Sequence, residues 1–232
     1  LCLKNPVTIV RAYGVTIATT VIGTFLSVFL STMTGYVLSR QDFPWREKVS
    51  FYFFFTTLFN GGLVPWYLLI TRYLGLKNNI LALILPMLFS VWNMIIAKTF
   101  MKGIPASITE SGTIDGATDF RIFFSLILPL SKPLLATLSL FSAIAYWNDW
   151  YNCMLFISND KLFTLQYYLQ RMLGSASAMR MVAEKSGMAM DSIPLSSMQM
   201  AMTVIATGPI ILLYPFIQKY FVKGLTIGAV KG

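Results

Sequence analysis

Histidine is absent from the 232-residue chain, and cysteine occurs only twice, at Cys2 and Cys153. Without histidine, neither a Ser-His-Asp triad nor an H-E-x-x-H metalloprotease site can form. Two cysteines cannot supply a structural zinc site or a disulfide framework. The chain also has no Gly-Lys pair, which a phosphate-binding P-loop requires. These absences exclude histidine-dependent catalysis and nucleotide hydrolysis through a P-loop.

Charge is also scarce, since only 12% of the residues are charged, whereas about 25% is usual for a soluble domain. Hydrophobic residues make up 56% of the chain, and the mean hydropathy is +0.67. That leaves too little polar surface to cover a water-soluble globule of this size. The 15% of aromatic residues excludes intrinsic disorder as well. The composition predicts a membrane protein.

The few charges are mostly basic, with 18 Lys and Arg against 9 Asp and Glu, a net charge of +9. No cluster of five or six basic residues occurs, which argues against nucleic-acid binding. The basic residues lie instead at the ends of apolar runs, where they anchor helices at lipid headgroups. Membrane lipid is therefore the expected surrounding, and nucleic acid is not an expected partner.

Five apolar segments are long enough to cross a bilayer, which takes about 20 residues in a helix. They cover residues 13–38, 51–73, 80–100, 133–157 and 202–222. The expected fold is all-α: a polytopic transmembrane helix bundle that forms one domain over residues 1–232. Because the first residue is Leu1 and not Met, we expect a sixth span upstream.

Two longer segments separate these spans, residues 102–132 and residues 158–200. In the second, Gly174 and Gly187 are expected to interrupt helices. The distribution of Lys and Arg places the charged turn 40–48, the loop 102–132 and the C-terminus in the cytoplasm. The segment 158–200 is then an extracytoplasmic loop.

The loop 102–132 is expected to form two short helices around a glycine hinge, with Gly112 and Gly116 as interruptions. Thr118 is an expected N-cap, followed by Asp119 at the positive helix end. An apolar stripe with helical spacing follows at Phe120, Phe123, Phe124 and Ile127. Periodicity leaves two interpretations open, an amphipathic helix lying on the membrane or an element that docks a partner.

This loop resembles the EAA motif of membrane subunits of ABC importers, which has Gly six residues after its Glu and ends in Ile-x-Leu-Pro. The matching residues are Glu110, Gly116 and the run Leu126–Pro129. The chain departs from the motif at Ser111 and Gly112, where the family has alanines, and at Leu126. The tail 218–232 resembles the C-terminus of maltose-type carbohydrate permeases, closest to the polysaccharide/lipoprotein branch.

The resemblance implies a type I ABC importer permease fold in the bacterial inner membrane and a role in carbohydrate import. The chain would not be an enzyme and would bind no cofactor, with ATP and Mg held by partner subunits. The implied partners are a second homologous permease, two cytoplasmic ATPase subunits and an extracytoplasmic sugar-binding protein. The residues implied to contact the ATPase are Glu110, Ser111, Gly112, Asp115, Gly116 and Ala117.

A run of aromatic and amide residues around Asp149 suits sugars, because rings stack on their C–H faces and amides bind their hydroxyl groups. A carboxylate within a span usually faces protein or a wet cavity. The candidate pathway residues are Tyr146, Trp147, Asn148, Asp149, Asn152, Asn60 and Asn93. The alternatives are an aromatic belt at the membrane interface, Asp149 as a helix cap, and Asn93 as an interhelical hydrogen bond.

A second function from another class is a stand-alone, ion-coupled secondary transporter. Such a carrier needs acidic or histidine residues within the membrane to relay cations. Asp149 is the one clear carboxylate inside a predicted span, which makes this alternative weakly supported.

Overall fold

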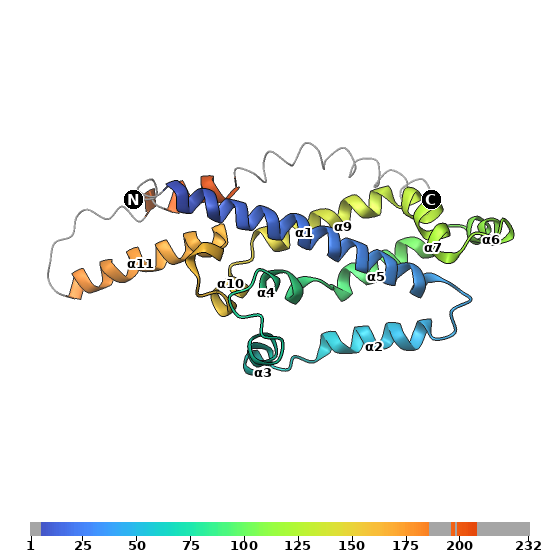
Figure 1. The fold of residues 1–232 in the computed structure, drawn as a ribbon, viewed down its shortest axis with the longest axis horizontal. Coiled ribbons are helices and arrows are strands. Elements are labelled where there is room, and N and C mark those ends of the chain that lie inside the picture. Colours follow the sequence, from blue (N-terminus) through green and yellow to red (C-terminus); the bar gives the residue numbers. More distant parts are fainter. Residues whose placement is uncertain (1–5, 186–195, 198, 208–232) are drawn as a thin grey trace.

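The computed structural model describes residues 6–185, 196–197 and 199–207, and every regular element within these ranges is a helix. The expected all-α class is confirmed. Three helices form the centre of the molecule: α1 (Pro6–Ser39), α5 (Val91–Lys102) and α9 (Lys132–Trp147). They lie side by side along the long axis in Figure 1, and α1 makes its most extensive contacts with the other two.

Only α1 is both unbroken and apolar enough to cross a membrane by itself among the described residues, over the 33 residues Val7–Ser39. Three further candidates are pairs of helices that bend at a short break, so up to four spans result if each pair is one span. The fifth predicted span lies largely outside the described residues, as do Gly187 and the tail 218–232.

The second predicted span, residues 51–73, is broken near its middle. It consists of α2 (Arg46–Leu58), α3 (Leu63–Leu68) and a π-helical turn (Leu69–Tyr73), with a bend of 111°. The break is at Asn60-Gly61-Gly62, where the Asn60 side chain accepts a hydrogen bond from the Gly62 N–H and Gly62 has a φ of +89°. Glycine adopts this left-handed conformation without steric cost.

The third and fourth predicted spans are interrupted where the sequence analysis expected continuous helices. Residues 80–100 contain α4 (Leu81–Ile84), a 3₁₀ turn (Leu85–Met87) and then α5, with a bend of 49°. Pro86 lies in this turn and cannot donate a backbone hydrogen bond. Residues 133–157 divide into α9 and α10 (Tyr151–Phe156). Because each break starts a helix with a new axis, side chains before and after it face different parts of the molecule.

The segment after α10 also differs from expectation. A short 3₁₀ turn (Asp160–Leu162) leads into α11 (Leu165–Lys185), which runs through Gly174 without interruption. The expectation that Gly174 interrupts a helix is therefore wrong. A single glycine costs a helix only about 1 kcal/mol relative to alanine, and the tertiary contacts of Leu165 and Leu169 hold the first turns of α11.

Small residues allow α1 to lie very close to its neighbours. A Cβ atom at Gly35 would lie 2.6 Å from the Ala97 Cβ of α5, and one at Gly23 would lie 2.4 Å from the Tyr146 ring of α9. Such contacts are typical of helix pairs in membranes, where close packing replaces the hydrophobic effect. The three central helices are thereby interlocked.

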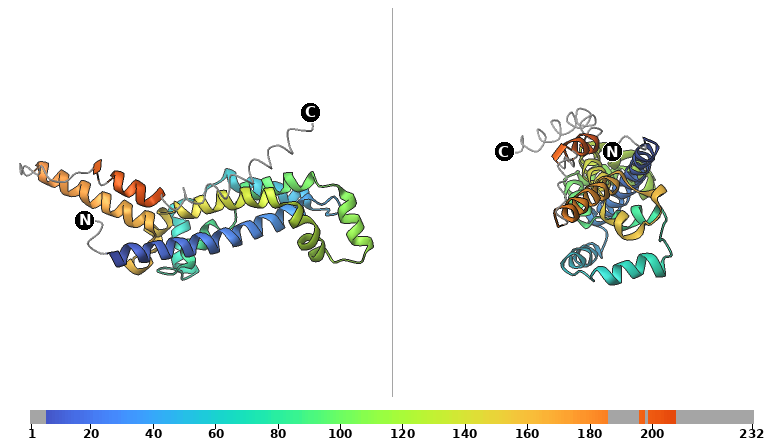
Figure 2. Two further views of the ribbon diagram at one scale, coloured as in Figure 1. Left: turned by 90° about the horizontal axis from the view of Figure 1, so that it is seen from above. Right: turned by 90° about the vertical axis from the view of Figure 1, so that its left-hand side faces the viewer.

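The loop 102–132 and the helix α11 lie at opposite ends of the elongated molecule. In Figure 1, α6 (Ala106–Ile114) and α7 (Asp119–Ile122) are beyond one end of α1, whereas α11 lies at the other. The left-hand view in Figure 2 shows the same separation. The α1 helix connects the two ends.

Candidate functional site

The loop 102–132 folds as two short helices joined by a tight turn, as the sequence predicted. The turn depends on Gly116, whose φ of +74° is strained for residues with a side chain. Thr118 caps α7, because its hydroxyl accepts a hydrogen bond from the Arg121 N–H at 3.4 Å. A π-helical turn (Phe123–Ile127) and α8 (Leu128–Leu130) complete the loop and lead to α9 at an 84° bend.

Gly112, in contrast, does not interrupt the loop. It is buried inside α6, and a Cβ atom there would lie 3.0 Å from Ile122 and 3.1 Å from Leu126. The expectation of a break at this residue is wrong, because its glycine serves close packing between α6 and the following helical segment. Gly112 fixes how α6 is held against the rest of the loop.

The predicted apolar stripe divides into a buried and an exposed part. Phe123 and Ile127 are buried among residues of α1, α5 and α9, whereas Phe120 is 65% exposed. Phe124 is also largely exposed and stacks its ring on Phe29 of α1. In the π-helical turn the backbone bonds span five residues and not four. Side chains after Phe123 therefore point in other directions than the regular α-helical spacing predicted. Three of the four stripe residues, all except Phe120, therefore contact the helix bundle.

Four of the six predicted ATPase-contact residues form an exposed surface on α6 and the following turn: Glu110, Ser111, Asp115 and Gly116. Gly112 is buried and Ala117 packs against the central core, so these two shape the loop. The sequence analysis missed Ile114, whose side chain is 85% exposed between the polar residues of this surface. An isoleucine directly before an Asp-Gly turn is the signal that could have identified it.

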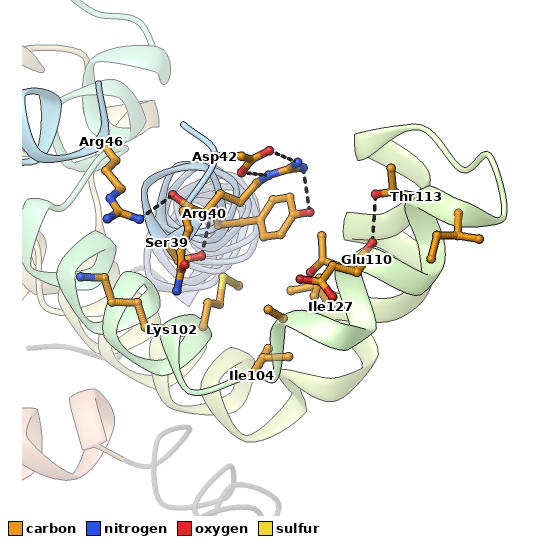
Figure 3. A pocket seen from close by; sticks show the side chains of 15 residues that line it. Ser39, Arg40, Asp42, Arg46, Lys102, Ile104, Glu110, Thr113 and Ile127 are labelled. Carbon is orange, nitrogen blue, oxygen red and sulfur yellow. Dashed lines mark hydrogen bonds and ion pairs between the residues drawn. The ribbon is translucent and has the colours of Figure 1, made fainter. Parts of the chain in front are cut away.

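A groove of about 770 Å³ separates α6 from the ends of α1 and α5. Arg40, Arg46 and Lys102 contribute basic side chains to its lining, and Glu110 contributes a carboxylate from α6 (Figure 3). Glu110 makes none of the ion pairs found among the described residues. Its carboxylate is therefore available to a partner.

Arg40 binds two carboxylates at the end of α1. Its Nε donates a hydrogen bond to Asp42 at 2.8 Å, and its Nη1 forms an ion pair with Asp119 at the start of α7. The bond from the guanidinium lowers the pKa of the Asp42 carboxyl below its usual value and raises that of Arg40. The sequence analysis placed Asp119 at a helix end but missed its partner 79 residues away.

Two of the candidate pathway residues, Asn60 and Asn152, line one cavity of about 610 Å³ between α3, the Pro86 turn and α10. Trp66 and Tyr151 also line it, so rings and amides meet there. Asp149 accepts hydrogen bonds from both the backbone and side-chain N–H groups of Asn152, each at 3.1 Å. Asp149 thus lies two residues before α10, accepts a hydrogen bond from its first turn and orients Asn152, in line with the capping alternative.

Tyr146, Trp147 and Asn148 have structural partners. The Tyr146 hydroxyl donates a hydrogen bond to the Ile84 carbonyl at 2.8 Å, and the Trp147 indole donates one to Ala206 at 3.0 Å. The Asn148 side chain bonds the Ile144 carbonyl within its own helix. Trp147 in particular packs in a cluster away from the cavity that holds Asn60 and Asn152.

Asn93 joins the three central helices by hydrogen bonds. Its amide donates to the Ser142 hydroxyl at 3.2 Å, and Ser142 in turn donates to Ser27 at 3.5 Å. Asn93 and Tyr146 also line a smaller cavity of about 330 Å³. The interhelical hydrogen bond that the sequence analysis offered as an alternative for Asn93 is confirmed.

We expect Asn93→Ala to lower the free energy of unfolding by about 1 kcal/mol, the upper part of the range for such bonds within membranes. Ser142→Ala should cost a similar amount, and the double variant should cost little more than either, because both remove the same bond. Thermal unfolding of the purified protein measures this. Fully additive losses would show that the two side chains act independently.

Comparison with known proteins gives concordant results. A family model described as "Binding-protein-dependent transport system inner membrane component" matches residues 19–227. The chain is 41% identical to the polygalacturonan/rhamnogalacturonan transport system permease protein YtcP of Bacillus subtilis (strain 168), over 97% of this chain and 78% of that protein. It is 37% identical to protein LplC of the same organism, over 97% of this chain and 75% of that protein.

A solved structure shares the fold. The crystal structure of a bacterial ABC transporter involved in the import of the acidic polysaccharide alginate contains a chain that matches with a TM-score of 0.79 at 29% identity. The match covers 92% of this chain and 75% of that one.

Proposed function

The chain belongs to the family of binding-protein-dependent transport system inner membrane components, and on that premise we propose that it couples oligosaccharide passage to ATP hydrolysis through α6. Members of this family are membrane-embedded translocation subunits of ABC importers. They are not enzymes, because partner ATPases hydrolyse the ATP. A carbohydrate cargo agrees with the sugar permeases among the relatives.

The exposed surface of α6 is the observation that carries this proposal. Glu110, Ser111, Asp115 and Gly116 contact the ATPase, and Ile114 inserts into an apolar part of its groove. Ile114, 85% exposed among these polar residues, adds an apolar side chain to the surface. Gly112 and Ala117 hold the surface in place from within the loop.

The proposed orientation places the loop 102–132 in the cytoplasm and the segment 158–200 outside. The positions of α6 and α11 at opposite ends of the molecule support it (Figure 1). The assembly would then hold a second homologous permease, two ATPase subunits with ATP and Mg, and an extracytoplasmic binding protein that delivers the sugar.

The cavity lined by Asn60, Asn152, Trp66 and Tyr151 is the proposed sugar contact in this half of the pathway. Aromatic rings beside amides suit a sugar, and the break at Gly61-Gly62 exposes backbone to the cavity. An acidic oligosaccharide is the first candidate cargo. Two relatives support it by name, YtcP for polygalacturonan and rhamnogalacturonan and the transporter for alginate.

Reconstitution tests the proposal. With a partner permease, ATPases and binding protein in vesicles, uptake of an oligogalacturonate should require ATP and Mg, and a maltooligosaccharide should compete poorly. Glu110→Lys should lower uptake at least about tenfold, since reversing the charge of one interface residue costs 1.4 kcal/mol or more. Ser107→Lys, an exposed change on α6 outside the proposed contact set, is the matched control and should leave uptake within about twofold.

Uptake driven by an ion gradient without any ATPase would overturn the proposal in favour of a secondary transporter. That alternative is not favoured, because the family works with partner ATPases. Its one candidate carboxylate, Asp149, is also engaged with Asn152.

A further inference from the structure

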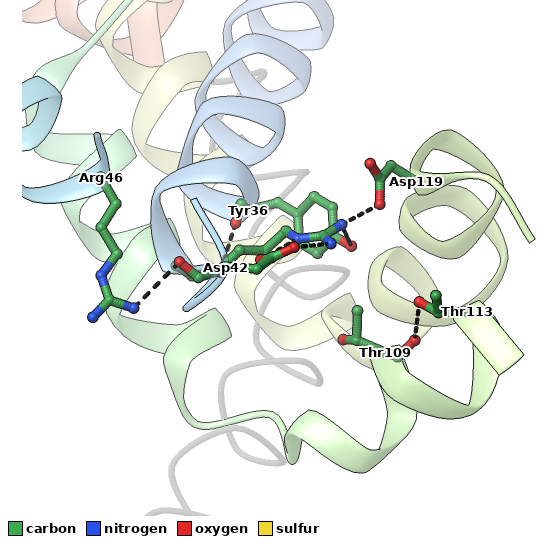
Figure 4. Close-up of polar contacts among 8 residues, drawn as sticks. Tyr36, Asp42, Arg46, Thr109, Thr113 and Asp119 are labelled. Carbon is green, nitrogen blue, oxygen red and sulfur yellow. Dashed lines mark hydrogen bonds and ion pairs between the residues drawn. The ribbon is translucent and has the colours of Figure 1, made fainter. Parts of the chain in front are cut away.

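Three contacts, spaced along the C-terminal part of α1, join it to the loop 102–132. The Phe29 and Phe124 rings stack at 6.2 Å, and the Tyr36 and Phe123 rings lie 5.3 Å apart. At the tip of α1, Arg40 forms its ion pair with Asp119 (Figure 4). All three loop residues belong to α7 or the π-helical turn, directly after the proposed ATPase surface.

The Arg40 side chain is held in position for this contact. Only 19% of it is exposed, and its guanidinium lies 5.8 Å from the centre of the Tyr36 ring. Asp42 binds the Nε and Nη2 side of the guanidinium fork, which leaves Nη1 directed at Asp119. An arginine held on several sides makes a directional contact that an isolated surface pair does not.

The covalent connection from the loop to the bundle is, in contrast, bent. Between α8 and α9 the chain turns by 84° at Ser131, with Pro129 and Pro133 on either side. A displacement of α7 is therefore not directed along the axis of α9. The contacts with α1 provide a second route, since α1 is one unbroken helix of 34 residues, about 51 Å long.

The geometry points to the Arg40–Asp119 pair as the contact through which a displacement of the loop 102–132 moves α1. The α1 helix then acts as a rigid lever across the membrane. This inference rests on the proposed docking of α6. Gly112 packs α6 onto Ile122 and Leu126, so movement of α6 reaches Asp119. At the far end of α1, the Thr16 hydroxyl accepts a hydrogen bond from the Leu165 N–H of α11 at 2.8 Å.

The ring contacts alone do not fix the register between α1 and α7. They hold the π-helical turn through Phe123 and Phe124, whereas Asp119 lies at the start of α7 beside the tip of α1. The charged pair specifies one position of Asp119 against the tip of α1. Arg40 and Asp119 are therefore positioning residues, and their effect is on the ratio of sugar moved to ATP hydrolysed.

The test compares two variants that each remove the charge of one ion-paired carboxylate at this end of the bundle. In the reconstituted importer, Asp119→Asn should leave the ATPase subunits bound and ATP hydrolysis active, while sugar uptake per ATP falls at least fivefold. Glu47→Gln, the matched control, should leave the ratio within twofold, because Glu47 pairs with Arg46 and Lys98 and links nothing to the loop. Asp119→Glu should restore most of the ratio.

An unchanged uptake per ATP in Asp119→Asn, or an equal loss in Asp119→Asn and Glu47→Gln, would overturn the inference. Loss of bound ATPase in Asp119→Asn would also overturn it, because Asp119 would then be a docking residue. The variant Gly116→Asp distinguishes a failure of the lever inference from a failure of the proposed docking of α6 to the ATPase. If that variant retains its ATPase and its uptake, the docking of α6 itself is wrong; if it loses both while Asp119→Asn behaves as wild type, only the lever is wrong.

Discussion

Gly116→Asp is expected to reduce sugar uptake more than tenfold while the chain remains in the membrane. Gly116 has a φ of +74°, a conformation that costs residues with a side chain about 1–2 kcal/mol. A Cβ atom there meets nothing within 4 Å, so no steric clash adds to this backbone strain. The new carboxylate adds to Asp115 on the surface proposed to enter the ATPase groove. Vesicle uptake and co-purification of the ATPase measure the effect.

Gly75 provides a control for the backbone strain. It has a φ of +63° and also has open space around its Cβ position, but it lies between α3 and α4, far along the chain from the loop. Gly75→Asp should therefore retain uptake within about twofold. Asparagine tolerates positive φ and carries no charge, so Gly116→Asn should lie between the wild type and Gly116→Asp. Equal losses at Gly75 and Gly116 would assign the effect to strain and not to docking.

Gly35→Val is expected to lower the free energy of unfolding by about 3 kcal/mol, at the upper end of the range for overpacking. The reason is distance, since a Cβ atom at Gly35 would lie 2.6 Å from the Ala97 Cβ and 2.9 Å from the Lys98 backbone nitrogen. Backbone atoms of α5 cannot rotate away as a side chain can. The helices must separate, and the contacts around Ala97 and Met101 weaken with them.

Gly14 lies on the same helix and is the matched control. It has nothing within 4 Å of its Cβ position, so Gly14→Val changes helix propensity equally without a clash. Its effect should stay within about 0.5 kcal/mol. Thermal unfolding in detergent and the amount of chain in the membrane are the measurements. Similar losses at both positions would show that the close α1–α5 contact does not determine stability.

The glycines show where inference from the sequence succeeds and fails. Gly116 was identified correctly, because an Asp-Gly pair followed by a capping threonine specifies a turn locally. Gly112 and Gly174 were wrongly expected to interrupt helices. The role of Gly112 depends on Ile122 and Leu126, which pack against it only after the loop has folded. Residue type alone does not distinguish a turn glycine from a packing glycine.

The candidate pathway residues show the same limit. Tyr146 to Asn152 were grouped because this contiguous run combines aromatic rings with amides and an acid, but the helix break at residues 148–150 points them in different directions. Asn152 meets Asn60 in a cavity, whereas Trp147 bonds Ala206 in a separate cluster. Neighbours along the chain are not neighbours in a site when a helix ends between them.

Composition and local pattern were sufficient for the membrane setting, the all-α class and the two-helix loop. Hydropathy, turn preference and capping act over a few residues, so a linear chain displays them directly. The Arg40–Asp119 pair, the three-helix hydrogen bonds of Asn93 and the breaks within the third and fourth predicted spans were decided by tertiary structure. They depend on which residues distant in sequence approach one another, and that is determined by the packing of whole helices.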